Sequence, residues 1–147
     1  MARARVAVIG VGFIGEEHLN ALLGHEQFEI VGICDQSPAL AAARSQQFSV
    51  PVYDDHTALL EQACPDYITI CTPHYSHSSI AIDAMSRGVH ALVEKPFTVS
   101  ASAAEECIDV MERTGMTMGV GFVMRLHPAH RKMRQLIEAG FVGDVVR

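Results

Sequence analysis

The sequence lacks the features that would place the protein in a membrane or outside the cell. Its apolar runs are short and are interrupted by glycine or acidic residues, whereas a membrane-spanning helix needs about 20 consecutive apolar residues. The first five residues lead directly into a predicted strand, without the apolar stretch of a signal peptide. We therefore expect no membrane partner and a cytoplasmic location.

Paired cysteines and clustered basic residues are also missing. The four cysteines show no Cys-x-x-Cys spacing, so we expect buried, unpaired thiols rather than disulfides or a zinc site. Two His-x-x-His pairs, at residues 74–77 and 127–130, have neither the spacing nor the glutamate of a zinc-binding helix. The net charge is −6 and the 11 Lys and Arg residues are scattered, which argues against a nucleic-acid partner.

What the sequence contains is a regular alternation of strand-like and helix-like segments. Its 147 residues suffice for one domain with a hydrophobic core, but not for two full domains. Longer periodic segments predict helices, and short apolar runs predict strands at residues 6–9, 28–34, 52–53, 67–71, 91–93 and 116–120. This alternation is typical of an α/β, doubly wound Rossmann fold, with a mainly parallel six-stranded sheet and helices on both faces.

Several helix ends are marked by capping residues. Ser37 and Pro38 predict the start of a helix that reaches Phe48, and Ser100 predicts the start of another over residues 101–113. Beyond the sixth strand, residues 128–139 predict an amphipathic helix. Residues 142–147 then resemble the beginning of one more strand.

A glycine-rich turn separates the first strand from the first helix. Gly10, Gly12 and Gly15 match the pattern Gly-x-Gly-x-x-Gly, in the strand–turn–helix context that gives it meaning. Gly10 permits the sharp turn, Gly12 lets a pyrophosphate approach the backbone, and Gly15 lets the helix pack close to the strand. Amides at the start of the helix, including those of Phe13 and Ile14, would then face the phosphates of a dinucleotide.

An acidic residue follows at the end of the second predicted strand. Asp35 lies twenty residues after Gly15, where its carboxylate can accept hydrogen bonds from the adenosine ribose. It would repel a 2′-phosphate, and no arginine directly follows it, so we expect NAD, with NADP less favoured. Arg44 lies too far along the helix to decide this point. The alternative is that the glycines only make a turn and Asp35 only ends a strand.

Further short motifs follow in the second half of the chain. In order they are Thr72-Pro73, His77, Gly88-Val89-His90, Glu94-Lys95-Pro96 and Arg-Leu-His-Pro-Ala at residues 125–129. These motifs, together with the glycine turn, Asp35 and His18, resemble those of the Gfo/Idh/MocA oxidoreductases. Apart from this resemblance, we expect His18 to be a packed histidine. This family includes glucose-fructose oxidoreductase and inositol dehydrogenase. The most specific mark is the Glu-Lys-Pro turn at the carboxyl end of a strand.

The resemblance implies that Lys95 is the catalytic residue. It would lie at the carboxyl edge of the sheet, where open α/β sheets bind their ligands. There a partly buried lysine could exchange a hydroxyl proton as hydride moves to or from the nicotinamide ring. The alternative is a solvated loop lysine paired with Glu94.

The resemblance also implies which residues contact the cofactor outside the glycine turn. These are Thr72, Pro73, His74, His77, Glu94, Lys95 and Arg125. His74 departs from the pattern, because members of the family commonly have asparagine at this position. Arg125 has an alternative interpretation as part of a polar linker.

The family resemblance also bears on domain organisation, because its members carry a large second domain that supplies the substrate pocket. We expect a NAD-binding Rossmann domain at residues 1–121, and at 122–147 a linker helix and the beginning of a C-terminal domain that is absent from this chain. Without that domain the chain would bind the cofactor but turn over poorly, since hydride transfer needs an oriented substrate in a sheltered cleft.

The expected function is therefore that of the cofactor-binding domain of an NAD(P)-dependent oxidoreductase acting on a sugar, inositol or related polyol. Such a small molecule is the expected partner, together with a second copy of the chain in a homo-oligomer. One alternative is a non-catalytic NAD-binding or dimerising module with an exposed sheet edge. Another is an S-adenosylmethionine or flavin domain on the same fold.

Overall fold

A parallel sheet organises the chain, of which the computed structural model describes residues 2–146. The strand order is β2-β1-β3-β4-β5 and every neighbouring pair is parallel. The strands are β1 (Ala4–Ile9), β2 (Phe28–Cys34), β3 (Tyr67–Ile70), β4 (His90–Val93) and β5 (Met118–Val120). The helices are α1 (Phe13–Leu23), α2 (Pro38–Phe48), α3 (His56–Ala63), α4 (His77–Ser86), α5 (Ala101–Thr114) and α6 (Pro128–Glu138), with short 3-10 helices η1 (His74–Ser76) and η2 (Val123–Arg125).

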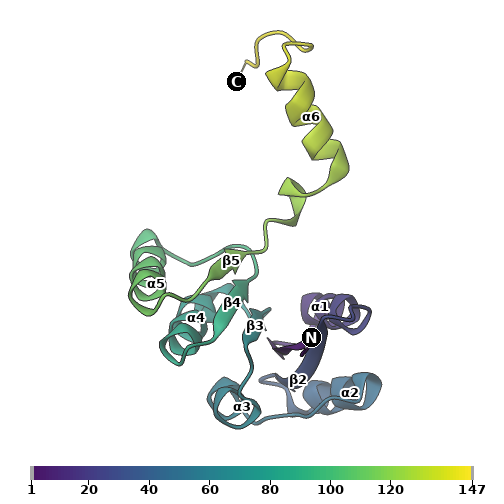
Figure 1. The fold of residues 1–147 in the computed structure, drawn as a ribbon, viewed down its shortest axis with the longest axis vertical. Helices are drawn as coiled ribbons and strands as arrows, with labels where there is room; N and C mark the ends of the chain where they lie inside the picture. Colours follow the sequence, from purple (N-terminus) through teal and green to yellow (C-terminus); the bar gives the residue numbers. More distant parts are fainter. Residues whose placement is uncertain (1, 147) are drawn as a thin grey trace.

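Helices lie on both faces of this sheet, as in a Rossmann fold, although the part of one face beside α1 has no helix over it (Figure 1). On one face, Ile68 and Ile70 of β3 are fully buried in a core with α3, α4 and α5. On the other face, Val8 of β1 and Ile33 of β2 are fully buried with residues of α1 and α2. The predicted α/β class is confirmed, and the continuous apolar runs of the strands follow from burial on both sides.

The predicted number of six strands is wrong, because residues 52–53 form only an isolated bridge. Val52 pairs with Ile33 alone. The Ile33 N–H donates to the Pro51 carbonyl and the Tyr53 N–H donates to the Ile33 carbonyl, both at 2.9 Å. Pairing cannot extend, since proline has no N–H to donate and Asp55 already caps α3.

The predicted strand at residues 142–147 is also wrong for the part that the structure describes. Residues 142–146 have turn and irregular backbone and are exposed, whereas Arg147 lies outside the described residues. Apolar residues alone do not make a strand, because a strand needs a neighbour to take its backbone hydrogen bonds.

The helix starts follow the predicted caps. The Ser37 hydroxyl accepts the Leu40 N–H at 3.4 Å, with Pro38 in the first turn, and the Ser100 hydroxyl accepts the Ala103 N–H at 3.2 Å. Each bond satisfies an amide that has no partner within its helix. Gly115, with φ of +70°, ends α5.

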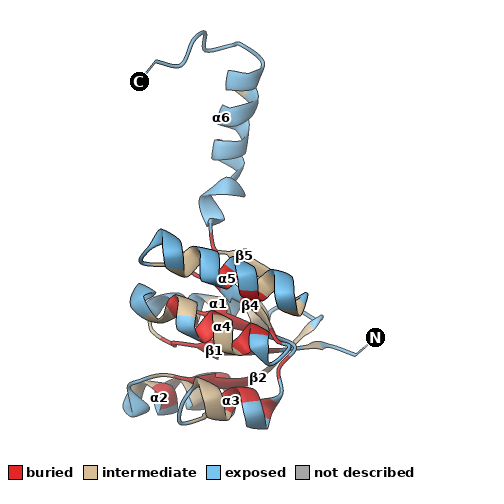
Figure 2. Cartoon of the chain, turned by 90° about the vertical axis from the view of Figure 1, so that its left-hand side faces the viewer, coloured by how far each residue is buried: buried red, intermediate tan, exposed pale blue. Residues whose placement is uncertain are grey.

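Helix α6 stands apart from the sheet and its covering helices. Figures 1 and 2 show it projecting from the end of the sheet beyond β5, with its surface exposed. None of its residues is buried, and the side chains of Met133 and Ile137 remain 56% and 42% exposed. Neither α6 nor any other helix within residues 2–146 is long and apolar enough to cross a lipid bilayer.

Candidate functional site

Two glycines of the turn after β1 are required by close approach of the backbone. Gly10 has φ of +84°, and a Cβ at this residue would lie 2.8 Å from backbone atoms of Cys71 and Thr72. A Cβ at Gly15 would lie 2.0 Å from the Gly10 carbonyl oxygen. Any larger residue would therefore force α1 away from β1. The loops after β1 and β3 meet at the start of α1 because both positions lack a side chain.

Gly12 differs from these two glycines, because the space beside it is open. A Cβ built at Gly12 would have nothing within 4 Å. Gly12 is the N-cap of α1, and no side chain caps the helix. The side chains of Phe13 and Ile14 that follow are 76% and 39% exposed. The first amides of α1 are therefore available to an anion, which a helix N-terminus attracts.

The carboxylate of Asp35 is fixed beside this turn by two backbone hydrogen bonds. Its Oδ2 accepts the Val11 N–H at 2.8 Å, and its Oδ1 accepts the Ser37 N–H at 2.9 Å. These bonds join the end of β2 to the glycine turn. An ionised carboxylate has about four acceptor positions, so both oxygens can still accept hydrogen bonds from ligand hydroxyls.

A hollow of about 390 Å³ lies where β1, β2 and β3 end. Its lining comes from the glycine turn, from the start of the segment after β2 and from the loop after β3: Gly10, Gly12, Asp35, Gln36, Leu40, Cys71, Thr72 and Pro73. The structure thus brings together predicted site residues from three distant segments. Gln36, Leu40 and Cys71 were not predicted. The signal available in the sequence is their position, since Gln36 and Leu40 closely follow Asp35 and Cys71 directly precedes Thr72.

The two cysteines nearest this hollow are not candidate nucleophiles. Burial raises the pKa of the Cys34 thiol to about 12, with Asp55 and Asp35 adding to the shift. Burial likewise raises the pKa of the Cys71 thiol to about 12, and the nearby Glu94 carboxylate adds to the shift. All four cysteines are unpaired, with Cys64 exposed. No group of three or more metal ligands occurs among residues 2–146.

Glu94 and Lys95 follow β4, and their side chains take opposite directions. Glu94 is only 9% exposed; its Oε1 lies 3.1 Å from His18 Nε2, and its Oε2 accepts the Lys95 N–H at 3.1 Å. A Cβ at Gly121 would lie 2.8 Å from Glu94 Oε1, so this glycine makes room for the carboxylate. The expected partial burial of Lys95 is wrong: Lys95 is exposed because Glu94 occupies the inward position.

The loop after β3 places its two histidines very differently. His74 is exposed in η1, whereas His77, the first residue of α4, is 1% exposed. The His77 ring lies between two carbonyl oxygens, with Nε2 2.8 Å from that of Thr72 and Nδ1 2.9 Å from that of Pro96. Both ring nitrogens are therefore occupied by the chain itself.

Arg125 does not line the 390 Å³ hollow beside the glycine turn. It lies in η2, is exposed, and lines a separate hollow that faces α6, together with Arg131 and Arg134.

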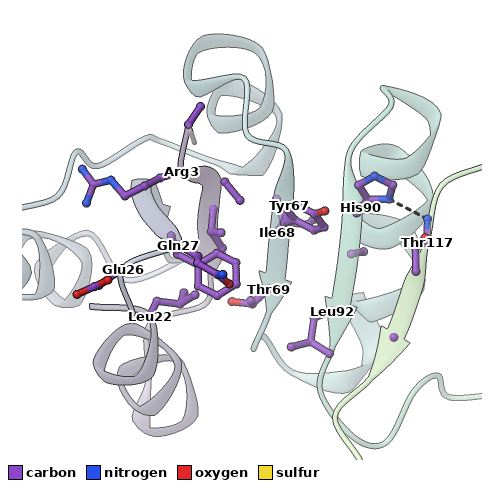
Figure 3. A pocket seen from close by; sticks show the side chains of 16 residues that line it. Arg3, Leu22, Glu26, Gln27, Tyr67, Ile68, Thr69, His90, Leu92 and Thr117 are labelled. Atoms are coloured by element: carbon purple, nitrogen blue, oxygen red, sulfur yellow. Dashed lines mark hydrogen bonds between the residues drawn. The ribbon is translucent and has the colours of Figure 1, made fainter. Parts of the chain in front are cut away.

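A larger hollow of about 860 Å³ also lies away from the predicted site. It occupies the uncovered sheet face beside α1 and is lined in part by Leu22, Tyr67, Thr69 and Leu92 (Figure 3). No predicted site residue lines it. Its size therefore does not make it the candidate site, which is defined by the glycine turn and Asp35.

Arg44 has a contact that sequence reasoning missed. Its guanidinium forms a two-point ion pair with the Glu16 carboxylate, at 2.7 and 2.5 Å, and its Nε donates to the Val11 carbonyl at 3.3 Å. Asp35 holds the N–H of the same Val11. The glycine turn is therefore held from both sides. No local pattern predicts this contact, because it joins the middle of α2 to the first turn of α1.

The sequence of the chain matches a known family. Residues 4–122 match the Gfo/Idh/MocA oxidoreductases, described as an oxidoreductase family with an NAD-binding Rossmann fold. The chain belongs to this family. The resemblance expected from the Gly-x-Gly-x-x-Gly and Glu-Lys-Pro motifs is thereby confirmed, and so is the Rossmann architecture on which it depends.

Relatives within the Gfo/Idh/MocA family are longer than this chain. It is 33% identical over 141 residues to UDP-N-acetylglucosamine 3-dehydrogenase of Acidithiobacillus ferrooxidans, with 96% of this chain and 43% of the relative covered. A 3-ketoreductase from Actinomadura kijaniata, solved with NADP, has a TM-score of 0.89 at 27% identity, with coverages of 97% and 44%. Scyllo-inositol dehydrogenase from Lactobacillus casei, solved with NAD(H) and scyllo-inositol, shares the fold with a TM-score of 0.89 at 22% identity, with coverages of 97% and 43%. The chain thus spans less than half of each relative.

Proposed function

We propose that this chain is the cofactor-binding part of an NAD-dependent oxidoreductase that moves hydride between nicotinamide and a sugar, inositol or related polyol. The observation that carries the proposal is the Asp35 carboxylate, fixed by two backbone hydrogen bonds beside the open glycine turn. A carboxylate there accepts ribose hydroxyls and repels a 2′-phosphate, which favours NAD over NADP. The relative at 33% identity, a UDP-N-acetylglucosamine 3-dehydrogenase, supports a sugar substrate.

The residues around the hollow fit a dinucleotide. The amides at the start of α1 would hold the pyrophosphate, in the space that the missing Cβ of Gly12 leaves open. Asp35 would hold the adenosine ribose, and the loop containing Thr72, Pro73 and His74 would border the nicotinamide half. When bound, the nicotinamide ring supplies the position that gives or takes hydride.

Proton transfer falls to Lys95 in this proposal. Its backbone is held by Glu94, while its side chain extends from the carboxyl edge of the sheet into solvent. There its amine can take a proton from a substrate hydroxyl or return one. Glu94, whose Oε1 contacts His18 Nε2, would approach the cofactor from the buried side of the same turn.

We further propose that the chain is divided into two functional parts. Residues 1–121 would form the cofactor domain, and residues 122–147 a linker helix leading toward a substrate-binding part. The unburied α6 and the greater length of the relatives support this division. A non-catalytic NAD-binding or dimerising module is the second candidate, favoured by the exposed position of Lys95.

The decisive experiment titrates the chain with NADH and NADPH and compares Asp35→Asn with wild type. We expect Asp35→Asn to weaken NADH binding by about tenfold or more, because a hydrogen bond to a charged group is lost. We also expect it to reduce the preference of the protein for NADH over NADPH. Asp109→Asn, which changes an exposed carboxylate on α5, is the matched control. If wild type binds neither nucleotide, or if Asp35→Asn behaves as the control does, the proposal fails.

NADH formation from a panel of sugars and polyols separates the two candidates. Activity that is lost in Lys95→Ala, with NADH affinity retained, supports the oxidoreductase. An intact chain that binds NADH but forms none with any substrate, even over long incubation, supports the non-catalytic module, since the oxidoreductase is expected to turn over slowly without a substrate-binding domain.

A further inference from the structure

Arg44 reaches the glycine turn from the middle of α2. It follows Leu40 by four residues, so the two lie on the same face of the helix, and Leu40 lines the hollow beside the glycine turn. Arg44 Nε donates to the Val11 carbonyl at 3.3 Å, while the Val11 N–H donates to Asp35 at 2.8 Å. A single residue therefore separates the guanidinium of Arg44 from the carboxylate proposed to hold the adenosine ribose.

The hydrogen-bond donors of this guanidinium are already engaged within the chain. Its Nη1 and Nη2 donate to the two carboxylate oxygens of Glu16, at 2.7 and 2.5 Å, and Nη1 also donates to Gln47 Oε1 at 2.7 Å. With the contact to Val11, four of the five guanidinium N–H groups have acceptors. The side chains of Arg44 and Glu16 are 19% and 25% exposed, so solvent screens their attraction only in part. Arg44 thus has little left to offer a ligand.

An arginine free of such a partner would favour a different cofactor. NADP differs from NAD by a phosphate on the 2′-hydroxyl of the adenosine ribose, which is the ribose that Asp35 is proposed to hold. Arginine binds phosphate through paired N–H donors, and a nearby arginine accommodates the 2′-phosphate in Rossmann folds that bind NADP. This chain has an arginine close to Asp35, but it supplies the counter-charge from its own Glu16.

We propose that Glu16 is a specificity-determining residue, which masks Arg44 and thereby keeps the site selective for NAD over NADP. The inference rests on the proposed function and extends it. Asp35 repels the 2′-phosphate, and Glu16 withholds the cation that would compensate for this repulsion. Glu16 acts through Arg44 and needs no contact of its own with the cofactor. The tertiary contact gives Arg44 the part in cofactor choice that its place in the sequence left open.

Titration of Glu16→Ala with NADH and NADPH tests this mask. We expect the affinity for NADPH relative to that for NADH to rise by about tenfold, because the released guanidinium can pair with the 2′-phosphate. The ratio of the two affinities cancels any effect of the lost charge on the pyrophosphate, which both nucleotides share. Glu17→Ala is the matched control, since it removes the same charge from an exposed neighbouring residue, and its ratio should equal that of wild type.

A double variant, Glu16→Ala with Arg44→Leu, separates the release of Arg44 from the loss of a negative charge. We expect the gain for NADPH to disappear in this variant, because no guanidinium remains to be released. An unchanged ratio in Glu16→Ala would overturn the proposal. So would a gain that persists in the double variant, or one that appears equally in Glu17→Ala, since each would assign the effect to charge alone.

The same titrations distinguish failure of this inference from failure of the proposed function. A wild type that binds NADH, with no gain for NADPH in Glu16→Ala, overturns the inference alone, as does a wild type that prefers NADPH. A chain that binds neither nucleotide in any variant overturns both. If circular dichroism shows that Glu16→Ala does not fold, Glu16→Gln replaces it, because it removes the charge and keeps the length of the side chain. A rise in the ratio is again expected, and an unchanged ratio again overturns the proposal.

Discussion

At the scale of single residues, Gly12 and Gly15 differ in what surrounds them. Gly12 borders open space and is the N-cap of α1, whereas Gly15 lies so close to the Gly10 carbonyl that a Cβ would clash with it. Serine is a favoured N-cap residue, so we expect Gly12→Ser to keep or raise stability while it blocks the pyrophosphate and abolishes measurable NADH binding. Gly15→Ala should instead destabilise the fold by about 2 kcal/mol or more, because its Cβ has no room.

Urea denaturation and an NADH titration of both variants check this contrast. The expected pattern is loss of binding without loss of stability for Gly12→Ser, and loss of stability for Gly15→Ala. An unstable Gly12→Ser, or one that binds NADH normally, would contradict the assignment of that space to a phosphate.

The cysteines offer a second test at this scale, through alkylation. Because burial raises the pKa values of Cys34 and Cys71 to about 12, their thiolates are scarce at pH 8 and become abundant only as the pH approaches 12. Cys64 is exposed. Iodoacetamide at pH 8 followed by peptide mass spectrometry should therefore find Cys64 modified first. Faster modification of Cys71 would show that the hollow opens more than the structure indicates.

Single residues also show which parts of the site could be predicted from the sequence and which could not. Gly10, Asp35 and Thr72 could be predicted as one site, because each follows a strand and parallel strands end at the same edge of a sheet. The contacts of Arg44 with Glu16 and of His18 with Glu94 could not. They depend on how helices pack, and neither residue carries a local pattern that names its partner.

At the scale of elements, the capping residues set where helices begin, and Ser100 is the clearest to test. Its hydroxyl accepts the Ala103 N–H at the start of α5. We expect Ser100→Ala to lower the free energy of unfolding by about 1 kcal/mol. Urea denaturation measures it, with Ser86→Ala at the exposed end of α4 as the control. Equal midpoints for the two variants would argue against a stabilising cap.

The elements that were predicted correctly are those with signals of their own. The glycine turn and the caps at Ser37 and Ser100 marked α1, α2 and α5. The strand at residues 52–53 was wrong because Pro51 and the cap of α3 leave no room for a ladder. A short apolar run indicates burial, but whether it pairs depends on its neighbours.

At the scale of the whole molecule, the sheet and its covering helices should fold without α6. No residue of α6 is buried, and the part that matches the family ends at residue 122. We expect removal of residues 123–147 to shift the midpoint of thermal unfolding by less than about 2 °C, because little buried surface is lost. Circular dichroism measures the shift. A large drop would show that these residues stabilise the core.

The parallel arrangement of all five strands also gives the molecule two unlike ends. The glycine turn, Asp35 and Lys95 all follow strands, whereas residues 25–27 lie exposed in the turn that precedes β2. A dye or a surface tether attached at residues 25–27 would therefore stand at the far side of the sheet. Immobilised in that orientation, the chain would present the proposed nucleotide crevice to the solution, which is the arrangement that a biosensor for dinucleotides requires.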